Sequence, residues 1–288
     1  MIYQTLLLSH EDGVAALTLN RPQSYNAISV TMLQELLLVL DEIEADDSLR
    51  AVLITGAGRA FSSGGDLTGP LDPEIDDPSV IPGLPPEHRD AVLARIGDKI
   101  GANLRAHHNP VAMRLHTFPK PVVCAVNGVA AGGAIGMALC CDIVVAARSA
   151  RFVPVFTPTL AFVPDFACSW HLTRLLGAAR ASALALLGEP LSAEDAERHG
   201  LLWKVFDDAE LVAGAMDIAR RVGRNSRNAN RLTKQAMQAA QRNDLSQQLA
   251  LEADFQQHCG STLDFIEGVL AFQQKRKPQF NRSPEPHT

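Results

Sequence analysis

The chain has 288 residues, of which 47% are hydrophobic, and carries a formal net charge of −6 at pH 7. This length and composition suit one large globular domain, or a domain with an appendage, and the mixing of charges excludes the basic stripe that nucleic-acid binding needs. No apolar run reaches the roughly 18 residues of a membrane span, and the first residues lack a signal peptide's basic start, so we expect no membrane partner and a cytoplasmic location.

The first half of the chain alternates strand and helix signals. Asp12-Gly13 separates two β-rich runs and favours a hairpin, and Ser29 can cap a helix over residues 30–45. Strands are predicted at residues 3–9, 14–20, 51–55, 122–126 and 143–147. Because parallel strands need right-handed crossovers, these elements predict an α/β layer whose loops gather at one edge.

Two glycine-bearing loops, residues 56–66 and 127–136, each follow a predicted strand. Glycine tolerates positive φ, so such loops can turn main-chain amides outward, and two amides on one substrate oxygen make an oxyanion hole. The spacing fits neither a Walker loop nor a dinucleotide fingerprint. The alternative for either loop alone is a tight turn that only permits close packing.

Residues 69–90 are rich in Pro, Gly and Asp, and a helix is predicted from about Pro86 to Leu115. We therefore predict that the segment 69–110 is an insertion beside the first glycine loop. It is either a lid over a site or a plain surface insertion.

From Leu184 onward the pattern is helical almost throughout. Capping signals and apolar stripes predict helices near 192–198, 208–224, 228–241, 245–259 and 262–275. We divide the chain into a core (1–205), a helical oligomerisation region (206–277) and a flexible tail (278–288).

The cysteines predict structural thiols, because no C-x-x-C pair occurs and most lie in apolar surroundings. Cys168 is the cysteine of most interest, because it lies three residues after Asp165. The histidines at 107, 108 and 116 lack metal-ligand spacing, so we expect surface or packing roles and no metal site.

Several motifs together are more specific than either loop. They are Leu19-Asn20-Arg21-Pro22, Ala60-Phe61-Ser62-Ser63-Gly64-Gly65-Asp66, Pro119-Lys120-Pro121-Val122, and Asn127-Gly128 leading to Gly132-Gly133 and Cys141-Asp142-Ile143. With these motifs the chain resembles the enoyl-CoA hydratase/isomerase (crotonase) superfamily over nearly its whole length. Residues 142–188 look closest to the bacterial epoxyphenylacetyl-CoA isomerase and enoyl-CoA isomerase branch.

The resemblance implies a spiral of stacked ββα units, a C-terminal helical trimerisation region, and acyl-CoA substrates. It places the oxyanion amides at Gly65 and Gly133. The glutamates of the family's hydratases fall at Gly136 and near Phe156 or Thr157, so both positions lack a carboxylate here.

Asp142 and Asp165 are the only acidic residues between Leu115 and Gly188. Asp142 directly precedes a strand, which favours a capping or loop-fixing role. Asp165 lies among apolar residues that should raise its pKa toward the operating pH, so it is the candidate acid and base. The alternative is that Asp165 caps the helix that follows it.

By resemblance the CoA moiety meets Ser63, Asp66 and Leu67, with Phe272 and Lys275 approaching its nucleotide end, either from the same chain or from a neighbouring subunit. Residues 23–25 supply no cation, which leaves Arg21 to help bind the nucleotide. We expect no cofactor beyond the CoA of the substrate, and a homotrimer or a dimer of trimers.

With a single carboxylate, isomerisation of an acyl-CoA fits better than hydration: a double-bond shift or an epoxyphenylacetyl-CoA rearrangement. The alternatives are an enoyl-CoA hydratase that uses Asp165 alone, a hydrolase or carbon–carbon lyase, and a homologue that binds acyl-CoA with reduced catalysis.

Overall fold

The fold repeats a ββα unit four times. The structure, a computed structural model, describes residues 2–281. The units are β1 (Leu6–Glu11), β2 (Val14–Leu19) and α1 (Val30–Ala45); β3 (Ala51–Gly56), β4 (Ala60–Ser62), α2 (Pro86–Asn103) and α3 (Asn109–Thr117); β5 (Val122–Val126), β6 (Val129–Ala131) and α4 (Gly133–Leu139); and β7 (Ile143–Ala147), β8 (Arg151–Val153) and α5 (Cys168–Leu187). The predicted ββα spiral is confirmed.

The strands form two sheets. The larger has the order β1-β2-β3-β5-β7-β10 and is parallel except for the β1–β2 hairpin, while the smaller has the order β4-β6-β8-β9. From the second unit to the fourth, each unit gives its first strand to the larger sheet and its second to the smaller. The remaining elements are β9 (Leu191–Ser192), α6 (Ala193–Arg198), β10 (Lys204–Phe206), α7 (Leu211–Gly223), α8 (Arg227–Ala240), α9 (Leu245–Gly260) and α10 (Leu263–Gln273).

The N-terminal elements form where the sequence predicted them. Asp12 and Gly13 both have positive φ, 49° and 78°, as a tight hairpin turn requires, although β1 begins three residues later than expected. The Ser29 side chain accepts a hydrogen bond from the Met32 amide and caps α1. Helix α1 buries its apolar stripe, with Leu33, Leu36 and Leu40 inaccessible to solvent.

The two glycine-bearing segments are not simple loops, which corrects the sequence analysis. Each contains a short strand, β4 or β6, and these pair in parallel in the smaller sheet, with Ala60 opposite Val129. The loops that carry Gly65 and Gly133 therefore leave the ends of β4 and β6 rather than those of β3 and β5. Because β4 and β6 are neighbours, their carboxyl ends lie side by side.

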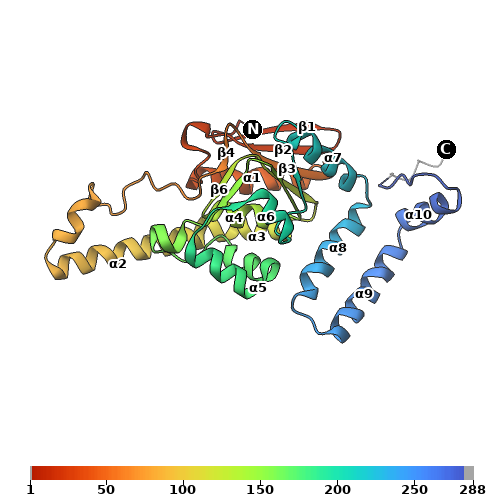
Figure 1. Ribbon diagram of the computed structural model, residues 1–288. Helices are drawn as coiled ribbons and strands as arrows, with labels where there is room; N and C mark the ends of the chain where they lie inside the picture. The colour runs from red at the N-terminus through yellow and green to blue at the C-terminus, as the bar shows by residue number, and fades with distance from the viewer. Residues whose placement is uncertain (1, 282–288) are drawn as a thin grey trace.

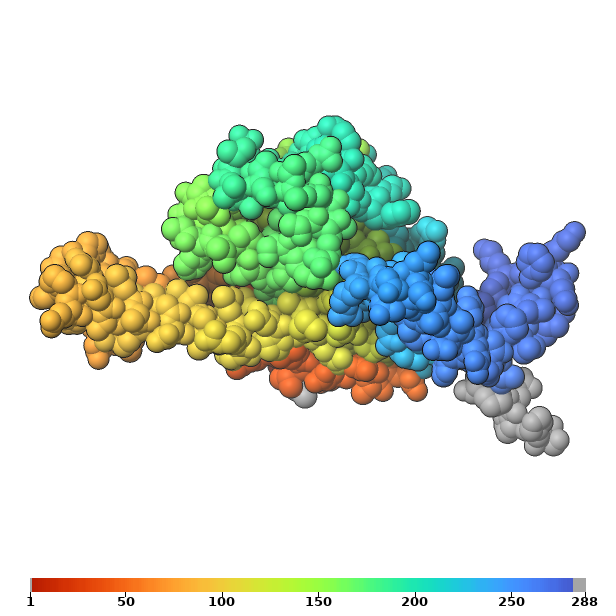
Figure 2. Space-filling model, turned by 90° about the horizontal axis from the view of Figure 1, so that it is seen from below, coloured from red at the N-terminus to blue at the C-terminus, as the bar shows by residue number. Residues whose placement is uncertain are grey.

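The segment between β4 and α2, together with α2 itself, extends away from the body of the molecule at one end (Figures 1 and 2). It includes a 3₁₀ turn, Pro78–Gly83. Asp72 is fully buried and receives two hydrogen bonds from Arg95 of α2, of 2.9 and 3.2 Å, while Lys99 donates to the Pro70 carbonyl. These contacts fix the insertion to α2.

The single helix predicted from Pro86 to Leu115 is interrupted. A π turn, Leu104–His108, joins α2 to α3. A second π turn, Phe156–Leu160, follows β8. Such turns interrupt helices most often at functional sites.

The C-terminal helices lie at the other end of the molecule (Figure 1). Helix α7 contacts β3 and β5 and so covers the larger sheet, whereas α9 and α10 lie beyond α8, away from the core. Lys234 of α8 pairs with Asp142 at 2.6 Å, and Gln238 donates to the His116 carbonyl. The part of the predicted tail beyond Asn281 lies outside the described residues. No helix within residues 2–281 is long and apolar enough to span a membrane.

Candidate active site

A cavity of about 590 Å³ is lined by the loops that follow β4, β6 and β8, by the start of α1 and by the end of α2. Its size is that of an ordinary small-molecule site. Its lining includes the predicted residues Ser63, Gly65, Asp66, Leu67, Gly133 and Asp165. Six residues chosen from separate stretches of sequence therefore lie around one space.

The backbone at Gly65 lines the cavity and turns its N–H away from Ile28. Ile28 donates to the Gly64 carbonyl at 2.8 Å and accepts from the Asp66 amide at 3.1 Å. Because Ile28 bonds to both neighbours of Gly65, the N–H of Gly65 itself points the other way. Within residues 2–281 this N–H donates to no protein acceptor.

Gly133 is the first residue of α4, so its amide is one of the N-terminal N–H groups that a helix leaves unpaired. The preceding Gly132 has φ 53°, which sets the turn into the helix. A Cβ on Gly64 would lie 2.6 Å from the Ala131 carbonyl oxygen, so the two loops touch where they reach the cavity. A side chain at position 64 would hold them apart.

Asp165 lies directly over Gly133. Its Oδ1 is 3.0 Å from the position that a Cβ on Gly133 would take. This oxygen is buried and has no hydrogen-bond partner among the described residues. Burial raises the pKa of Asp165 to about 6, against a smaller opposing effect of its own backbone amide. The carboxyl can therefore exchange a proton near neutral pH.

The capping alternative for Asp165 is wrong. The N-cap of α5 is Ala167, and no side chain caps this helix; only the main-chain carbonyl of Asp165 accepts, from Cys168 at 2.8 Å. Phe166 and Ala167 both have positive φ, 50° and 57°, an uncommon conformation for side-chain-bearing residues that is found mostly where function requires it. The strained turn holds the carboxyl over the glycine.

The structure shows why position 136 carries no carboxylate. A Cβ on Gly136 would lie 2.1 Å from the main-chain oxygen of Phe166, so the turn that presents Asp165 occupies the space of any side chain there. Of the two candidates for the other position, Phe156 is buried and lines the cavity, whereas Thr157 is exposed and does not. A carboxylate at position 136 and this placement of Asp165 exclude each other.

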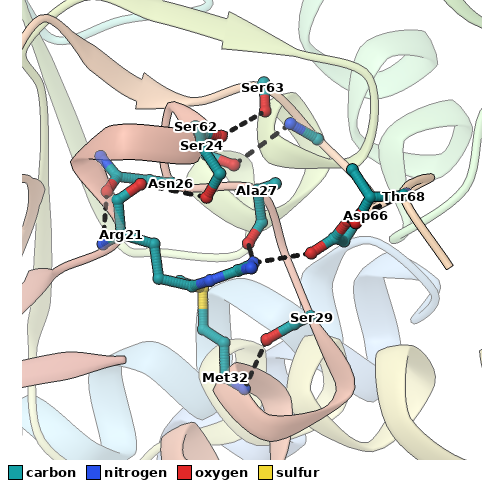
Figure 3. Close-up of polar contacts among 11 residues, drawn as sticks. Arg21, Ser24, Asn26, Ala27, Ser29, Met32, Ser62, Ser63, Asp66 and Thr68 are labelled. Atoms are coloured by element: carbon teal, nitrogen blue, oxygen red, sulfur yellow. Dashed lines mark hydrogen bonds and ion pairs between the residues drawn. The ribbon is translucent and has the colours of Figure 1, made fainter. Parts of the chain in front are cut away.

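The first glycine loop is clamped by the segment before α1 (Figure 3). Arg21 pairs with Asp66 at 2.8 Å and donates to the Ala27 carbonyl, while the Ser63 hydroxyl donates to the Ser24 carbonyl. Hydrogen bonds from Thr68, then the Arg21 guanidinium, lower the pKa of Asp66 against the effect of burial. Arg21 does not line the cavity, so in this chain it holds the loop, and its contact with CoA stays a prediction.

Phe272 and Lys275 are not brought to the cavity within one chain. Phe272 belongs to α10 at the far end of the molecule and is 86% exposed. Their approach from a neighbouring subunit stays a prediction.

The other sequence predictions fare as follows. Asp142 accepts from the Val122 amide at 2.7 Å, which confirms its loop-fixing role. The five cysteines are unbridged; Cys168 is buried, burial raises its pKa to about 12, and it does not line the cavity. Residues 2–281 hold no group of three or more potential metal ligands.

Sequence reasoning missed three polar residues near the site. Asn103, just before the first π turn, and His108, its last residue, line the cavity. Arg59 stacks over the Tyr25 ring at 4.5 Å, beside a smaller hollow of about 350 Å³ that includes Ser63. The expectation of a surface or packing role for His108 was incomplete, because it packs against Phe166 and also faces the cavity. Interruption of a helical pattern at 104–108 was the one available signal.

This architecture, stacked ββα units with a cavity between two glycine loops, defines the crotonase-like class of folds. Residues 9–79 and 94–283 match the enoyl-CoA hydratase/isomerase family model, and the chain belongs to that family. The internal gap in this match, residues 80–93, lies in the insertion and the start of α2.

Proteins similar to this chain include both isomerases and hydratases, the two activities in the family's name. The chain is 43% identical over 275 residues to 1,2-epoxyphenylacetyl-CoA isomerase of Escherichia coli K12, covering 95% of this chain and 97% of the relative. It is 34% identical over 278 residues to the short-chain-enoyl-CoA hydratase of Clostridium acetobutylicum, covering 96% and 97%. A solved enoyl-CoA hydratase from Polaromonas sp. JS666 superimposes with a TM-score of 0.83 at 32% identity, covering 96% and 99%. The chain is thus an enzyme of the CoA-thioester hydratases and isomerases, and the predicted branch is confirmed.

Proposed function

We propose that the protein is an acyl-CoA isomerase that uses Asp165 to move a proton between two carbons of the acyl group. The observation that carries the proposal is the unpaired Oδ1 of Asp165 beside Gly133, in a site where the Gly136 position cannot hold a second carboxylate. A single carboxyl can return the proton that it removes. Hydration needs in addition a bound, oriented water.

In the proposed reaction the thioester oxygen accepts from the amides of Gly65 and Gly133. Asp165 takes a proton from the α carbon of a 3-enoyl thioester, and the electron pair of the broken C–H bond forms an enolate. The protonated carboxyl then gives the proton to the γ carbon, which moves the double bond into conjugation. One oxyanion donor contributes about 10²- to 10³-fold in rate, and general acid–base catalysis about 10²- to 10⁴-fold.

The substrate's CoA moiety is assigned to the exposed side of the same loops. Ser63, Asp66 and Leu67 line the cavity near its mouth, and Arg59 supplies a cation beside Ser63 that residues 23–25 lack. Lys275 of a second subunit would add charge at the nucleotide end. The homotrimer or dimer of trimers and the cytoplasmic location belong to this proposal.

The isomerase of Escherichia coli with 43% identity supports ring-epoxide rearrangement as the alternative within isomerisation. The second candidate function is hydration, because hydratases are also among the relatives. Isomerisation is the preferred candidate, since neither Phe156 nor Thr157, the two candidates for the second hydratase position, carries a carboxylate.

The test is a panel of 3-hexenoyl-CoA, crotonyl-CoA and 1,2-epoxyphenylacetyl-CoA, followed by mass spectrometry and thioester absorbance. We expect a product of unchanged mass and, in Asp165→Asn, a fall in kcat of about 10²- to 10⁴-fold. Rapid gain of water by crotonyl-CoA would overturn the order of the two candidates. Equal turnover by Asp165→Asn and the wild type would remove Asp165 from the mechanism.

A further inference from the structure

The wall of the cavity formed by the end of α2 carries two polar side chains that the proposed mechanism does not use. Asn103 and His108 both line the cavity, among the apolar residues Ile100, Leu104 and Leu71. His108 is only 8% exposed. Asn103 Oδ1 and His108 Nδ1 are buried and, across residues 2–281, have no hydrogen-bond partner.

Apart from Asp165 and the exposed Thr159, the other polar side chains of the lining are engaged by the protein. Ser29 caps α1, the Ser63 hydroxyl donates to Ser24, and Asp66 binds Arg21 and Thr68. An unpaired buried polar atom costs free energy unless a ligand pairs with it. Besides Asp165 Oδ1, the atoms on Asn103 and His108 are the buried side-chain atoms of the lining left for a ligand.

The π turn explains why these two side chains share one wall. Residues five apart in an α-helix point about 140° away from each other, since each residue turns the helix by about 100°. A π turn closes its hydrogen bond between residues five apart, as the Asn109 amide does with the Leu104 carbonyl. Five residues then make nearly one full turn, which brings Asn103 and His108 to the same face.

The pair lies close to the reacting groups. The His108 ring packs edge-on against Phe166, with centroids 5.9 Å apart, and Phe166 directly follows Asp165. Burial lowers the pKa of His108, against a smaller opposing effect of the nearby Asn103 main-chain carbonyl, so its imidazole is neutral and has one donor and one acceptor. The free oxygen of Asn103 is an acceptor.

Resting on the proposed isomerase function, we infer that Asn103 and His108 bind a hydroxyl group on the acyl chain of the substrate. A hydroxyl supplies one donor and accepts one hydrogen bond, so it donates to Asn103 Oδ1 and accepts from His108 when Nδ1 carries the imidazole proton. A purely hydrocarbon acyl group leaves both atoms unpaired. The two residues therefore determine specificity, while Asp165 does the chemistry.

The experiment compares 3-hexenoyl-CoA with its 5-hydroxy and 6-hydroxy derivatives on the full-length protein. We expect the wild type to prefer the better hydroxylated substrate by about tenfold or more in kcat/KM. The preference should fall to within about threefold of unity in His108→Phe, which keeps the ring packing on Phe166, and in Asn103→Leu. His107→Phe is the matched control, because His107 lies outside the cavity lining and the preference should persist.

A binding measurement separates this inference from the proposed function. Hexanoyl-CoA and 6-hydroxyhexanoyl-CoA cannot isomerise, and calorimetry gives their Kd ratio even for a protein without turnover. A ratio that favours the hydroxylated ligand and is lost in His108→Phe supports the inference even if isomerisation fails. Equal affinities in the wild type, or a preference unchanged in both variants, would overturn it.

Discussion

The proposed chemistry of this site depends on glycines, which have no side chain, and on one carboxyl oxygen that has no hydrogen-bond partner among the described residues. Gly133 leaves room for the Asp165 carboxyl, and Gly136 leaves room for the main chain that presents it. The carboxyl itself lacks a hydrogen-bond partner at Oδ1 within the described part of the chain. The space at these glycines sets the position of Asp165, and the burial of its unpaired oxygen raises its pKa.

The raised pKa of Asp165 predicts a particular pH dependence. As a base it must be ionised, so kcat/KM should fall below about pH 6, the pKa that burial gives it. The folded-state pKa lies above the unfolded value of about 3.9, so this group's contribution to stability is full below pH 4 and is lost as pH rises through about 6. Urea unfolding should show Asp165→Asn gaining stability relative to the wild type as the pH rises from about 4 to about 6, with a level difference above that. A difference that does not change across this range would contradict the assignment.

Gly133→Ala should lower kcat by about 10²-fold or more while the fold survives, because the new methyl group meets only the movable end of the Asp165 side chain. Gly136→Ala should fail to fold well, because its methyl group meets main-chain atoms. Gly97→Ala is the control, since nothing lies within 4 Å of its added Cβ in α2. Steady-state kinetics and thermal melts distinguish the three. Unchanged kcat in Gly133→Ala would show that the carboxyl does not act over that glycine.

At the scale of elements, the site is made by interruptions of regular structure. Two π turns line the cavity, and the short strands β4 and β6 bring the glycine loops together. The sequence predicted the elements of the hairpin, α1, β3 and β5 because their patterns are strong and local. It could not predict β4 and β6, since three-residue strands are defined by pairing partners about 70 residues away, nor the π turn, whose residues read as ordinary helix.

The insertion depends on one buried ion pair. Asp72 is enclosed and bound by two nitrogens of Arg95 and by the Glu74 amide. Asp72→Asn should weaken this attachment, because the neutral amide loses the charge that pairs with Arg95 and keeps one acceptor oxygen instead of two, and should speed hydrogen exchange across residues 69–85. Exposed Asp76 is the control, and Asp76→Asn should leave exchange unchanged. Equal protection in both variants would show that the ion pair does not fix the insertion.

At the scale of the whole molecule, the sequence also predicted where function lies but not how all of it is assembled. Gly65, Gly133 and Asp165 were correctly assigned to one cavity, because their motifs are contiguous and specific. Asn103 and His108 were missed, since they come from the insertion, outside those motifs. The contacts of Phe272 and Lys275 with CoA stay predictions, because a single chain places α10 far from the cavity.

The C-terminal helices expose apolar side chains that predict self-association. Leu245, Leu263 and Phe272 are at least two-thirds exposed, more than a soluble surface usually leaves bare in one region. Light scattering should give three or six times the mass of one chain, and Phe265→Asp should lower it. Lys275→Ala should raise KM severalfold without lowering the oligomer mass. A monomer with full activity would contradict both the assembly and the role of Lys275.

The ion pair between Asp142 and Lys234 has a consequence for how the chain matures. Asp142 lies at the start of β7, the strand beside the edge strand β10 of the larger sheet, whereas its cation comes from α8, which leaves the ribosome about ninety residues later. Until then this carboxylate lacks the cation that pairs with it, so the surface of the core that α8 contacts stays incomplete. Chains that stop before α8 should therefore need chaperones and be degraded, although every residue that lines the cavity has already been synthesised.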